Sequence, residues 1–179
     1  MTRRLSPGVT LVLGGARSGK SRFAEALVAS SGREPVYVAT ATAIDAEMVA
    51  RIARHRQRRG AGWRTVEAPV DLAGALARED GAGRAVLVDC LTLWVSNLMM
   101  EEADIAQAGE RLAATLSAMR APVVLVANEV GLGIVPDNAL ARSFRDHAGT
   151  LNQAVAGLAR TVYLVAAGLP LALKEDHDR

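Results

Sequence analysis

The stretch VTLVLGGARSGKSRFAEALVAS (residues 9–30) combines a short apolar run, a glycine-rich turn and a helical pattern. Its residues 14–21, GGARSGKS, match the pattern G-x-x-x-x-G-K-[S/T] at every defined position. Glycine permits the tight turn and the close backbone approach that a phosphate chain requires. The amide N–H groups of such a turn, together with the positive end of the following helix, attract anions. The stretch therefore predicts a buried strand, a phosphate-binding loop (P-loop) and a helix, as in nucleotide-binding proteins.

Two residues of the predicted P-loop have distinct chemical roles. We expect the Lys20 ammonium to reach the β- and γ-phosphates of a bound nucleotide, and the Ser21 hydroxyl to bind Mg²⁺. The expected phosphate contacts are Gly14, Gly15, Ala16, Arg17, Ser18, Gly19, Lys20 and Ser21.

Short apolar runs rich in β-branched residues alternate with longer helical patterns along the chain. Near-continuous apolar strands are typical of a parallel sheet that helices cover on both faces. The runs occupy residues 9–13, 35–39, 85–89, 122–127 and 161–166, with a shorter run at 63–67. Helices are expected at about 20–30, 45–59, 71–79, 103–120 and 138–159. The alternation predicts one doubly wound α/β domain over residues 1–179, with 169–173 as a candidate antiparallel edge strand.

The composition excludes several classes of protein. With 21 basic and 19 acidic residues the formal net charge is +2, too even for a protein that chiefly coats nucleic acid. The single cysteine, Cys90, excludes an intramolecular disulfide and a cysteine-based zinc site. The N-terminal residues lack a signal-peptide pattern, and no apolar run approaches the length of a membrane span. We therefore expect a cytoplasmic protein with no membrane span and no nucleic-acid partner.

A P-loop protein needs a carboxylate near its metal ion, at the end of a neighbouring strand. Asp89 follows the apolar run AVLV directly, which is the Walker-B arrangement for holding Mg²⁺ at the end of a neighbouring strand. A structural alternative is an aspartate that caps a turn. Glu129, after the run VVLVAN, is a weaker candidate for a metal ligand or base, and a structural role fits it equally well.

The segment RIARHRQRRG (51–60) sets one histidine, His55, among five arginines. Neighbouring positive charges disfavour the imidazolium and so favour a neutral ring. On a helix, His55 continues an apolar stripe defined by Met48 and Ile52. Three interpretations stay open from the residues alone: a buried structural histidine, a solvated basic face for a polyanion, or a group at a nucleotide site.

Taken together, several blocks resemble a known family. They are GGARSGKSRFAE (14–25), YVATAT (37–42), DAEMVARIARHRQRR (45–59), WRTVEAP (63–69), VLVDCLTLWVSNL (86–98), NEVGLGIVPDN (128–138) and RSFRDHAGTLNQ (142–153). In this order, from about Leu11 to Leu173, the chain resembles the bifunctional adenosylcobinamide kinase / adenosylcobinamide-phosphate guanylyltransferases of cobalamin synthesis.

The resemblance implies a fold, an activity and a set of site residues. The implied fold is a RecA-like P-loop NTPase domain, and the implied assembly is a homotrimer. Such enzymes phosphorylate adenosylcobinamide with ATP or GTP. They then transfer GMP from GTP to adenosylcobinamide phosphate through a guanylylated histidine, which would be His55 here. Beyond the P-loop, the implied guanine-nucleotide contacts are Ala39, Thr40, Ala41, Arg56, Gln57, Arg58, Arg59, Glu67 and Asp89.

Two other functions compete with this interpretation. One is a P-loop kinase of another small molecule that lacks guanylyltransferase activity. The other is a nucleotide-switched module that uses its basic helix to bind a polyanion, although the balanced charge and scarce aromatic residues count against it.

Overall fold

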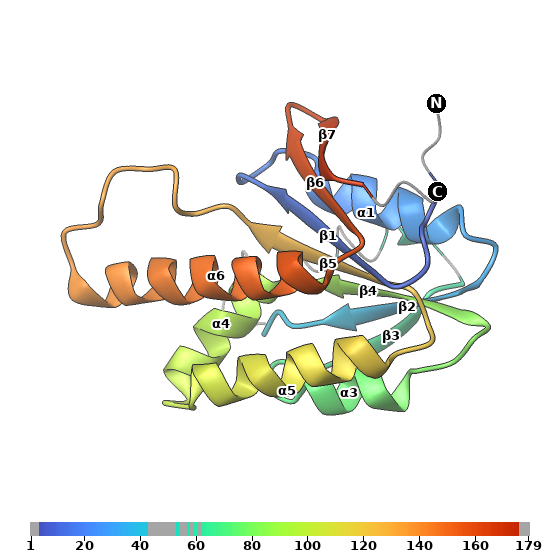
Figure 1. Ribbon diagram of the computed structural model, residues 1–179, viewed down its shortest axis with the longest axis horizontal. Coiled ribbons are helices and arrows are strands. Elements are labelled where there is room, and N and C mark those ends of the chain that lie inside the picture. Colours follow the sequence, from blue (N-terminus) through green and yellow to red (C-terminus); the bar gives the residue numbers. More distant parts are fainter. Residues whose placement is uncertain (1–3, 43–52, 54–56, 58, 61, 176–179) are drawn as a thin grey trace.

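The computed structural model describes residues 4–42, 53, 57, 59, 60 and 62–175 (Figure 1). The strands are β1 (Val9–Gly14), β2 (Glu34–Ala39), β3 (Arg64–Glu67), β4 (Arg84–Asp89), β5 (Val123–Asn128), β6 (Thr161–Ala166) and β7 (Leu169–Lys174). The helices that lie wholly within the described residues are α1 (Lys20–Ala29), α3 (Leu72–Arg78), α4 (Leu91–Met100), α5 (Ile105–Ala118) and α6 (Ala139–Leu158).

The strands of the described residues form one sheet of seven strands in the order β3-β2-β4-β5-β1-β6-β7. Every neighbouring pair is parallel except β6 and β7, which are antiparallel. The predicted α/β fold with a mostly parallel sheet is therefore confirmed, as is its antiparallel edge strand. Since parallel strands end at a common edge, the loops that follow β1, β2, β3, β4 and β5 lie together.

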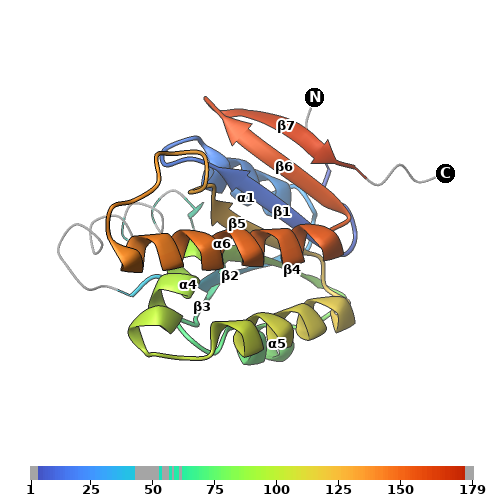
Figure 2. The same ribbon diagram turned by 60° about the vertical axis from the view of Figure 1, so that its left-hand side comes forward.

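Helices cover both faces of the sheet, with α1 on one face and α3, α4, α5 and α6 on the other (Figures 1 and 2). The core accordingly divides into two apolar clusters. The larger packs side chains such as Leu11, Leu125 and Leu112 under α3 to α6, and the smaller packs Val12 and Val126 under α1. Strands buried on both faces explain why the sequence runs are continuously apolar rather than alternating.

Side-chain caps set where three of the helices begin. Asp71 accepts a hydrogen bond from the Gly74 amide, Asp104 from the Gln107 amide, and Asn138 from the Ala141 amide. Each cap satisfies one of the amide donors that a helix leaves unpaired in its first turn. The helices expected at 71–79, 103–120 and 138–159 are confirmed within two residues at each end.

One helix of the structure, α4, was not predicted from the sequence; its residues read LTLWVSNLMM. Leu91, Trp94, Val95 and Leu98 are buried, and the segment carries no charged residue that would mark a solvent face. The buried residues do have helical spacing, but Leu93, Met99 and Met100 are apolar as well, so the sequence of this helix shows no contrast between an apolar and a polar face. Its N-cap, Cys90, makes no side-chain cap bond either, so the usual start signal is also absent.

The strand that carries Asp89 is not the immediate neighbour of the P-loop strand, contrary to the expectation from sequence. β4 pairs with β5, and β5 pairs with β1, so one strand separates Asp89 from the P-loop. The strand inserted between them brings Asn128 into register with Gly14. Asn128 and Glu129 are thus closer in the sheet to the P-loop than Asp89 is.

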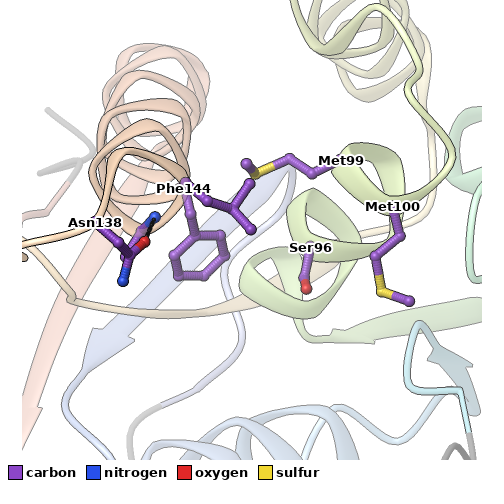
Figure 3. A pocket seen from close by; sticks show the side chains of 7 residues that line it. Ser96, Met99, Met100, Asn138 and Phe144 are labelled. Atoms are coloured by element: carbon purple, nitrogen blue, oxygen red, sulfur yellow. Dashed lines mark hydrogen bonds between the residues drawn. The ribbon is translucent and has the colours of Figure 1, made fainter.

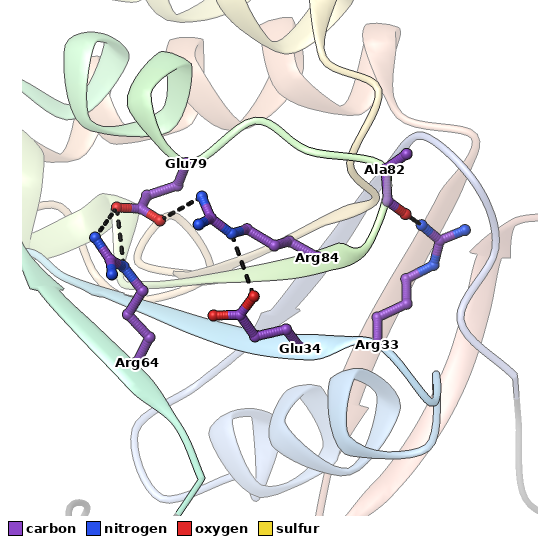
Figure 4. A network of polar contacts seen from close by, with 6 residues as sticks. All are labelled: Arg33, Glu34, Arg64, Glu79, Ala82 and Arg84. Carbon is purple, nitrogen blue, oxygen red and sulfur yellow. Dashed lines mark hydrogen bonds and ion pairs between the residues drawn. The ribbon is translucent and has the colours of Figure 1, made fainter.

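An ion-pair network secures the edge strand β3 (Figure 4). The Glu79 carboxylate accepts from Arg64 Nη2 at 3.0 Å and from Arg84 Nη1 at 3.0 Å, while Arg84 Nε lies 3.5 Å from Glu34 Oε2. The Glu79 side chain is only 6% exposed. Glu79 follows α3, so the network joins that helix to β2, β3 and β4.

The helix predicted over 45–59 lies outside the described residues, apart from Ala53, Gln57 and Arg59. Among the helices that the structure describes, none is long and apolar enough to cross a membrane.

Candidate nucleotide site

The P-loop connects β1 to α1 and has the backbone conformation of a tight turn. Gly19 precedes α1 with φ 95°, and Arg17 has φ 56°, both in the left-handed region. Lys20 opens the helix, is 7% exposed, and its Nζ donates to the Gly15 carbonyl at 3.0 Å. The strand, turn and helix predicted from residues 9–30 are therefore confirmed.

The turn between β6 and β7 packs against the P-loop. The Gly168 amide donates to the Ser18 carbonyl at 2.8 Å. A Cβ on Gly19 would lie 3.1 Å from Gly168 Cα, and one on Gly14 would lie 2.5 Å from both Ser18 Oγ and the Val165 carbonyl. The packing of the β6–β7 turn therefore requires glycine at positions 14 and 19, whether or not phosphate is bound.

The sheet register brings the other predicted site residues to the same edge. Ala39 pairs with Asp89 on one side and with Glu67 on the other. Beyond the ladder, the Glu129 amide donates to the Gly14 carbonyl at 3.1 Å, and the Glu129 carboxylate accepts from the Gly131 amide at 2.5 Å. The last contact gives Glu129 a local structural role.

Buried polar contacts fix the backbone beyond β2 and β4. Thr40 is fully buried, and its Oγ1 donates to the Cys90 carbonyl and accepts from the Cys90 amide, each at 2.8 Å. Asn97 Nδ2, on α4, donates to the carbonyls of Thr40 at 2.7 Å and Pro69 at 2.9 Å. The loops after β2 and β3 are thereby held to one helix.

Tyr37 lies between two predicted site residues. Its hydroxyl donates to Asp89 Oδ2 at 3.2 Å, and the Arg59 Cζ lies 3.3 Å from the centroid of its ring. Trp63 contacts the same ring edge-on, with centroids 6.4 Å apart. Of Arg56, Gln57, Arg58 and Arg59, the structure describes only Gln57, which is exposed, and Arg59. His55, Arg56 and Arg58 lie outside the described residues.

Burial controls the ionisation of two groups beside Asp89. Desolvation, with the Asp89 charge adding to it, raises the pKa of the Cys90 thiol to about 11. The same two causes raise the pKa of the Tyr37 phenol well above its ordinary value of 10.0. Both groups are therefore neutral at physiological pH, and the Tyr37 hydroxyl keeps the proton that it donates to Asp89.

The donor chemistry at the edge of the sheet fits Mg²⁺ bound together with a nucleotide. Asp89 would supply a carboxylate and Ser21 a hydroxyl, and Mg²⁺ prefers hard oxygen ligands of this kind. No cluster of three or more His, Cys, Asp or Glu side chains suited to a metal occurs among the described residues. A site with few protein ligands is typical of Mg²⁺, because nucleotide phosphates and water complete its shell.

An apolar groove lies between the end of α4 and the start of α6 (Figure 3). It has a volume of about 450 Å³ and is lined by Met99, Met100 and Phe144 among others, with Asn138 and Ser96 as polar members. The neighbouring loop and helix start expose Leu132, Ile134, Val135 and Leu140. This surface is chemically unlike the P-loop edge and lacks charged lining residues.

Comparison with known proteins identifies the family. Residues 10–173 match the family described as cobinamide kinase / cobinamide phosphate guanyltransferase. The chain belongs to this family. It is similar to the bifunctional adenosylcobalamin biosynthesis protein CobP of Pseudomonas aeruginosa, with 51% identity over 92% of this chain and 96% of that protein. The CobU protein of Escherichia coli K12, also named a bifunctional adenosylcobalamin biosynthesis protein, is 43% identical over 92% of this chain and 98% of its own length.

Solved structures show the fold that this cobinamide kinase / guanylyltransferase family member shares with other P-loop NTPases. A solved ATPase domain matches with a TM-score of 0.56 and 11% identity, over 94% of this chain and 77% of that one. The RadB recombinase matches with a TM-score of 0.50 and 17% identity, over 89% and 75%. The expected RecA-like fold is confirmed, and the chain is a bifunctional enzyme of the transferase class.

The predicted site residues thus divide into two groups. The P-loop, residues 39–41, Glu67 and Asp89 lie at one edge of the sheet, whereas most of the arginine segment lies outside the described residues. Sequence reasoning missed Tyr37 and Asn97. Tyr37 stands two residues before Ala39 on the same strand and hence on the same face, a spacing that could have identified it.

Proposed function

We propose that this enzyme phosphorylates adenosylcobinamide with ATP or GTP and then converts the product to adenosylcobinamide-GDP. The observation that carries the proposal is the complete P-loop at the same sheet edge as Asp89 and residues 39–41. Membership of the cobinamide kinase family supports the substrate. The protein is proposed to act in the cytoplasm.

For the kinase step, the P-loop amides and Lys20 would hold the phosphates, while Ser21 and Asp89 would hold Mg²⁺. Bound there, Mg²⁺ supplies charge neutralisation on the transferred phosphoryl group. The oxygen of the substrate hydroxyl would form a bond to the γ-phosphorus as the bond to the β-phosphate oxygen breaks, and the hydroxyl proton would pass to water. Positioning and electrostatics account for most of the acceleration in such reactions.

For the second step, we propose His55 as the nucleophile. A neutral imidazole nitrogen would bond to the α-phosphorus of GTP while pyrophosphate leaves, and the phosphate oxygen of adenosylcobinamide phosphate would then displace the histidine. The arginines at 54, 56, 58 and 59 favour the neutral ring and stabilise charge on the phosphoryl oxygens. Arg56, Gln57, Arg58, Arg59 and Glu67 are the proposed nucleotide contacts beyond the P-loop.

Labelling with [α-³²P]GTP tests the histidine directly. We expect acid-labile, alkali-stable label on the protein that disappears in His55→Ala and persists in His147→Ala, a matched change on α6. Active kinase without label would favour the simple kinase. Salt-sensitive RNA binding without phosphoryl transfer would favour the polyanion-binding module.

We also propose that the enzyme is a homotrimer. The exposed apolar side chains Leu132, Ile134 and Leu140 support self-association, because isolated monomers rarely expose such a patch. Ile134 is 98% exposed, so Ile134→Glu leaves the fold intact. Light scattering should give a trimer for the unmodified protein and a smaller species for Ile134→Glu. A monomeric unmodified protein contradicts the proposal.

A further inference from the structure

Tyr37 connects two parts of the enzyme that are far apart in the sequence. It is 7% exposed and stands in the middle of β2. Its hydroxyl contacts Asp89 at the end of β4, and its ring face contacts Arg59, the last arginine of the 51–60 segment. The proposed reaction scheme assigns no part to Tyr37 itself.

The hydroxyl contact fixes the orientation of the Asp89 carboxylate. The hydrogen bond from the Tyr37 hydroxyl to Oδ2, at 3.2 Å, contributes to restraining rotation of the carboxylate about its side-chain bonds. The Tyr37 ring packs in a T-shaped contact with Trp63 and belongs to the buried cluster under α1. Its hydroxyl group is therefore held in a fixed position, from which it donates to Asp89. Partners of this kind typically change metal affinity 10- to 100-fold when removed.

The ring contact fixes the Arg59 guanidinium. Its Cζ lies 3.3 Å from the ring centroid, close enough for a cation–π interaction. Arg59 Nη1 and Ser18 Oγ are the buried side-chain polar atoms of the described residues that have no hydrogen-bond partner. A buried donor without an acceptor is unfavourable, and an anionic oxygen from a ligand would satisfy it.

We propose that Tyr37 is a positioning residue for both reactions: its hydroxyl orients Asp89 toward Mg²⁺, and its ring orients Arg59 toward nucleotide phosphate. The inference rests on the proposed function, because that function assigns Asp89 to the metal and Arg59 to the nucleotide. It adds a physical connection between the carboxylate of the kinase site and the segment that contains His55.

The hydroxyl is tested by Tyr37→Phe, which keeps the ring. Binding of a fluorescent, non-hydrolysable GTP analogue is titrated with Mg²⁺, so the readout does not depend on turnover. The half-saturating Mg²⁺ concentration should rise about tenfold in Tyr37→Phe. Tyr163→Phe removes a hydroxyl from the other tyrosine of the same buried cluster and should stay within twofold of the unmodified protein.

The ring is tested by Tyr37→Leu and Arg59→Gln. At saturating Mg²⁺, the rate of labelling by [α-³²P]GTP in Tyr37→Phe should return to that of the unmodified protein. In Tyr37→Leu the rate should stay at least fivefold below that of the unmodified protein. Arg59→Gln should show the same Mg²⁺-resistant loss, and adding it to Tyr37→Leu should change the rate less than twofold, because both changes remove one contact. If Tyr37→Leu does not fold, Arg59→Gln alone tests the contact between the ring and the guanidinium.

An unchanged Mg²⁺ midpoint in Tyr37→Phe overturns the role of the hydroxyl. If saturating Mg²⁺ fully restores the labelling rate of Tyr37→Leu and Arg59→Gln, the proposed role of the ring is overturned. If the unmodified protein takes no GMP label, the guanylylation proposal fails instead, and the binding titration still decides whether Tyr37 orients the metal carboxylate.

Discussion

Thr40 illustrates at the scale of one residue how the edge of the sheet is held. Its hydroxyl both donates to and accepts from the backbone of Cys90, and neither contact is accessible to water. Its own carbonyl accepts from Asn97. A side chain in the predicted nucleotide loop therefore also determines where the residue after Asp89 lies.

Thr40→Val should lower the free energy of unfolding by about 2 kcal/mol. The change is nearly isosteric, but it leaves the buried Cys90 amide without its Thr40 acceptor, and it leaves the Cys90 carbonyl with the Trp94 amide as its remaining donor. Chemical denaturation measures the difference. Thr40→Ser retains the hydroxyl and should lose less than half as much, and equal losses would show that the methyl group, not the hydrogen bonds, is what matters.

Asp80 should make stability depend on acid pH. Hydrogen bonds from the Ala121 amide, and then from Arg120, hold the pKa of this carboxyl below its ordinary value of 3.8. A folded-state pKa below the unfolded one gives stability that is complete above pH 3.8 and lost as pH falls through the lower, folded pKa. Asp80→Asn should therefore be less stable by about 1 kcal/mol near pH 7, with the gap closing in acid. Denaturation curves across pH measure this, and a gap that does not narrow as pH falls below 3.8 contradicts the ionic origin.

At the scale of elements, the P-loop depends on the β6–β7 hairpin as well as on its own glycines. The Gly168 amide bonds the Ser18 carbonyl, and Gly168 Cα closes the space beside Gly19. The phosphate-binding turn is thus packed by an element near the other end of the chain.

Gly19→Ala should weaken nucleotide binding at least tenfold. A side chain at φ 95° is strained, and its Cβ would lie 3.1 Å from Gly168 Cα, so the turn or the hairpin must shift. Gly149→Ala is the matched control, because α6 leaves open space there. That control should bind nucleotide normally and gain about 0.5–1 kcal/mol from helix propensity. Normal nucleotide binding by Gly19→Ala would show that the β6–β7 hairpin can shift to accommodate the added methyl group.

The sequence predicted those elements whose patterns are local. The strand–turn–helix of residues 9–30 and the apolar strands could be identified because burial on both faces leaves a continuous apolar run. α4 could not, since a helix buried on several sides carries no polar stripe. Tyr37 and Asn97 were missed because their importance comes from contacts across the sheet, with Asp89 and with Pro69, which only the register of β2, β3 and β4 creates.

At the scale of the whole molecule, one buried carboxylate joins the edge of the sheet to the helical layer. Glu79 accepts from two arginines on different strands, β3 and β4, and follows α3. β3 is a short edge strand of four residues, so contacts from its side chains contribute much of its attachment.

Glu79→Gln should lower the free energy of unfolding by about 2 kcal/mol. Removing the buried charge leaves two arginines without their shared partner, while the 54% exposure of Arg64 moderates the loss. The pair of Arg78 and Asp71 offers a control, because both side chains are more than half exposed. Arg78→Gln should cost less than about 0.5 kcal/mol, and equal costs in the two variants would contradict a special role for burial.

The position of β1 has a consequence for how the protein is made. β1 precedes the other strands of this sheet along the chain, yet its partners in the sheet are β5 and β6. On a translating ribosome its apolar residues stay unpaired until β5 and β6 have emerged, roughly ten seconds later at usual elongation rates. The P-loop gains its hairpin support later still. A bound nucleotide can therefore stabilise this fold only after the β6–β7 hairpin has emerged, and until then the segment that contains β1 depends on other means of protection against aggregation.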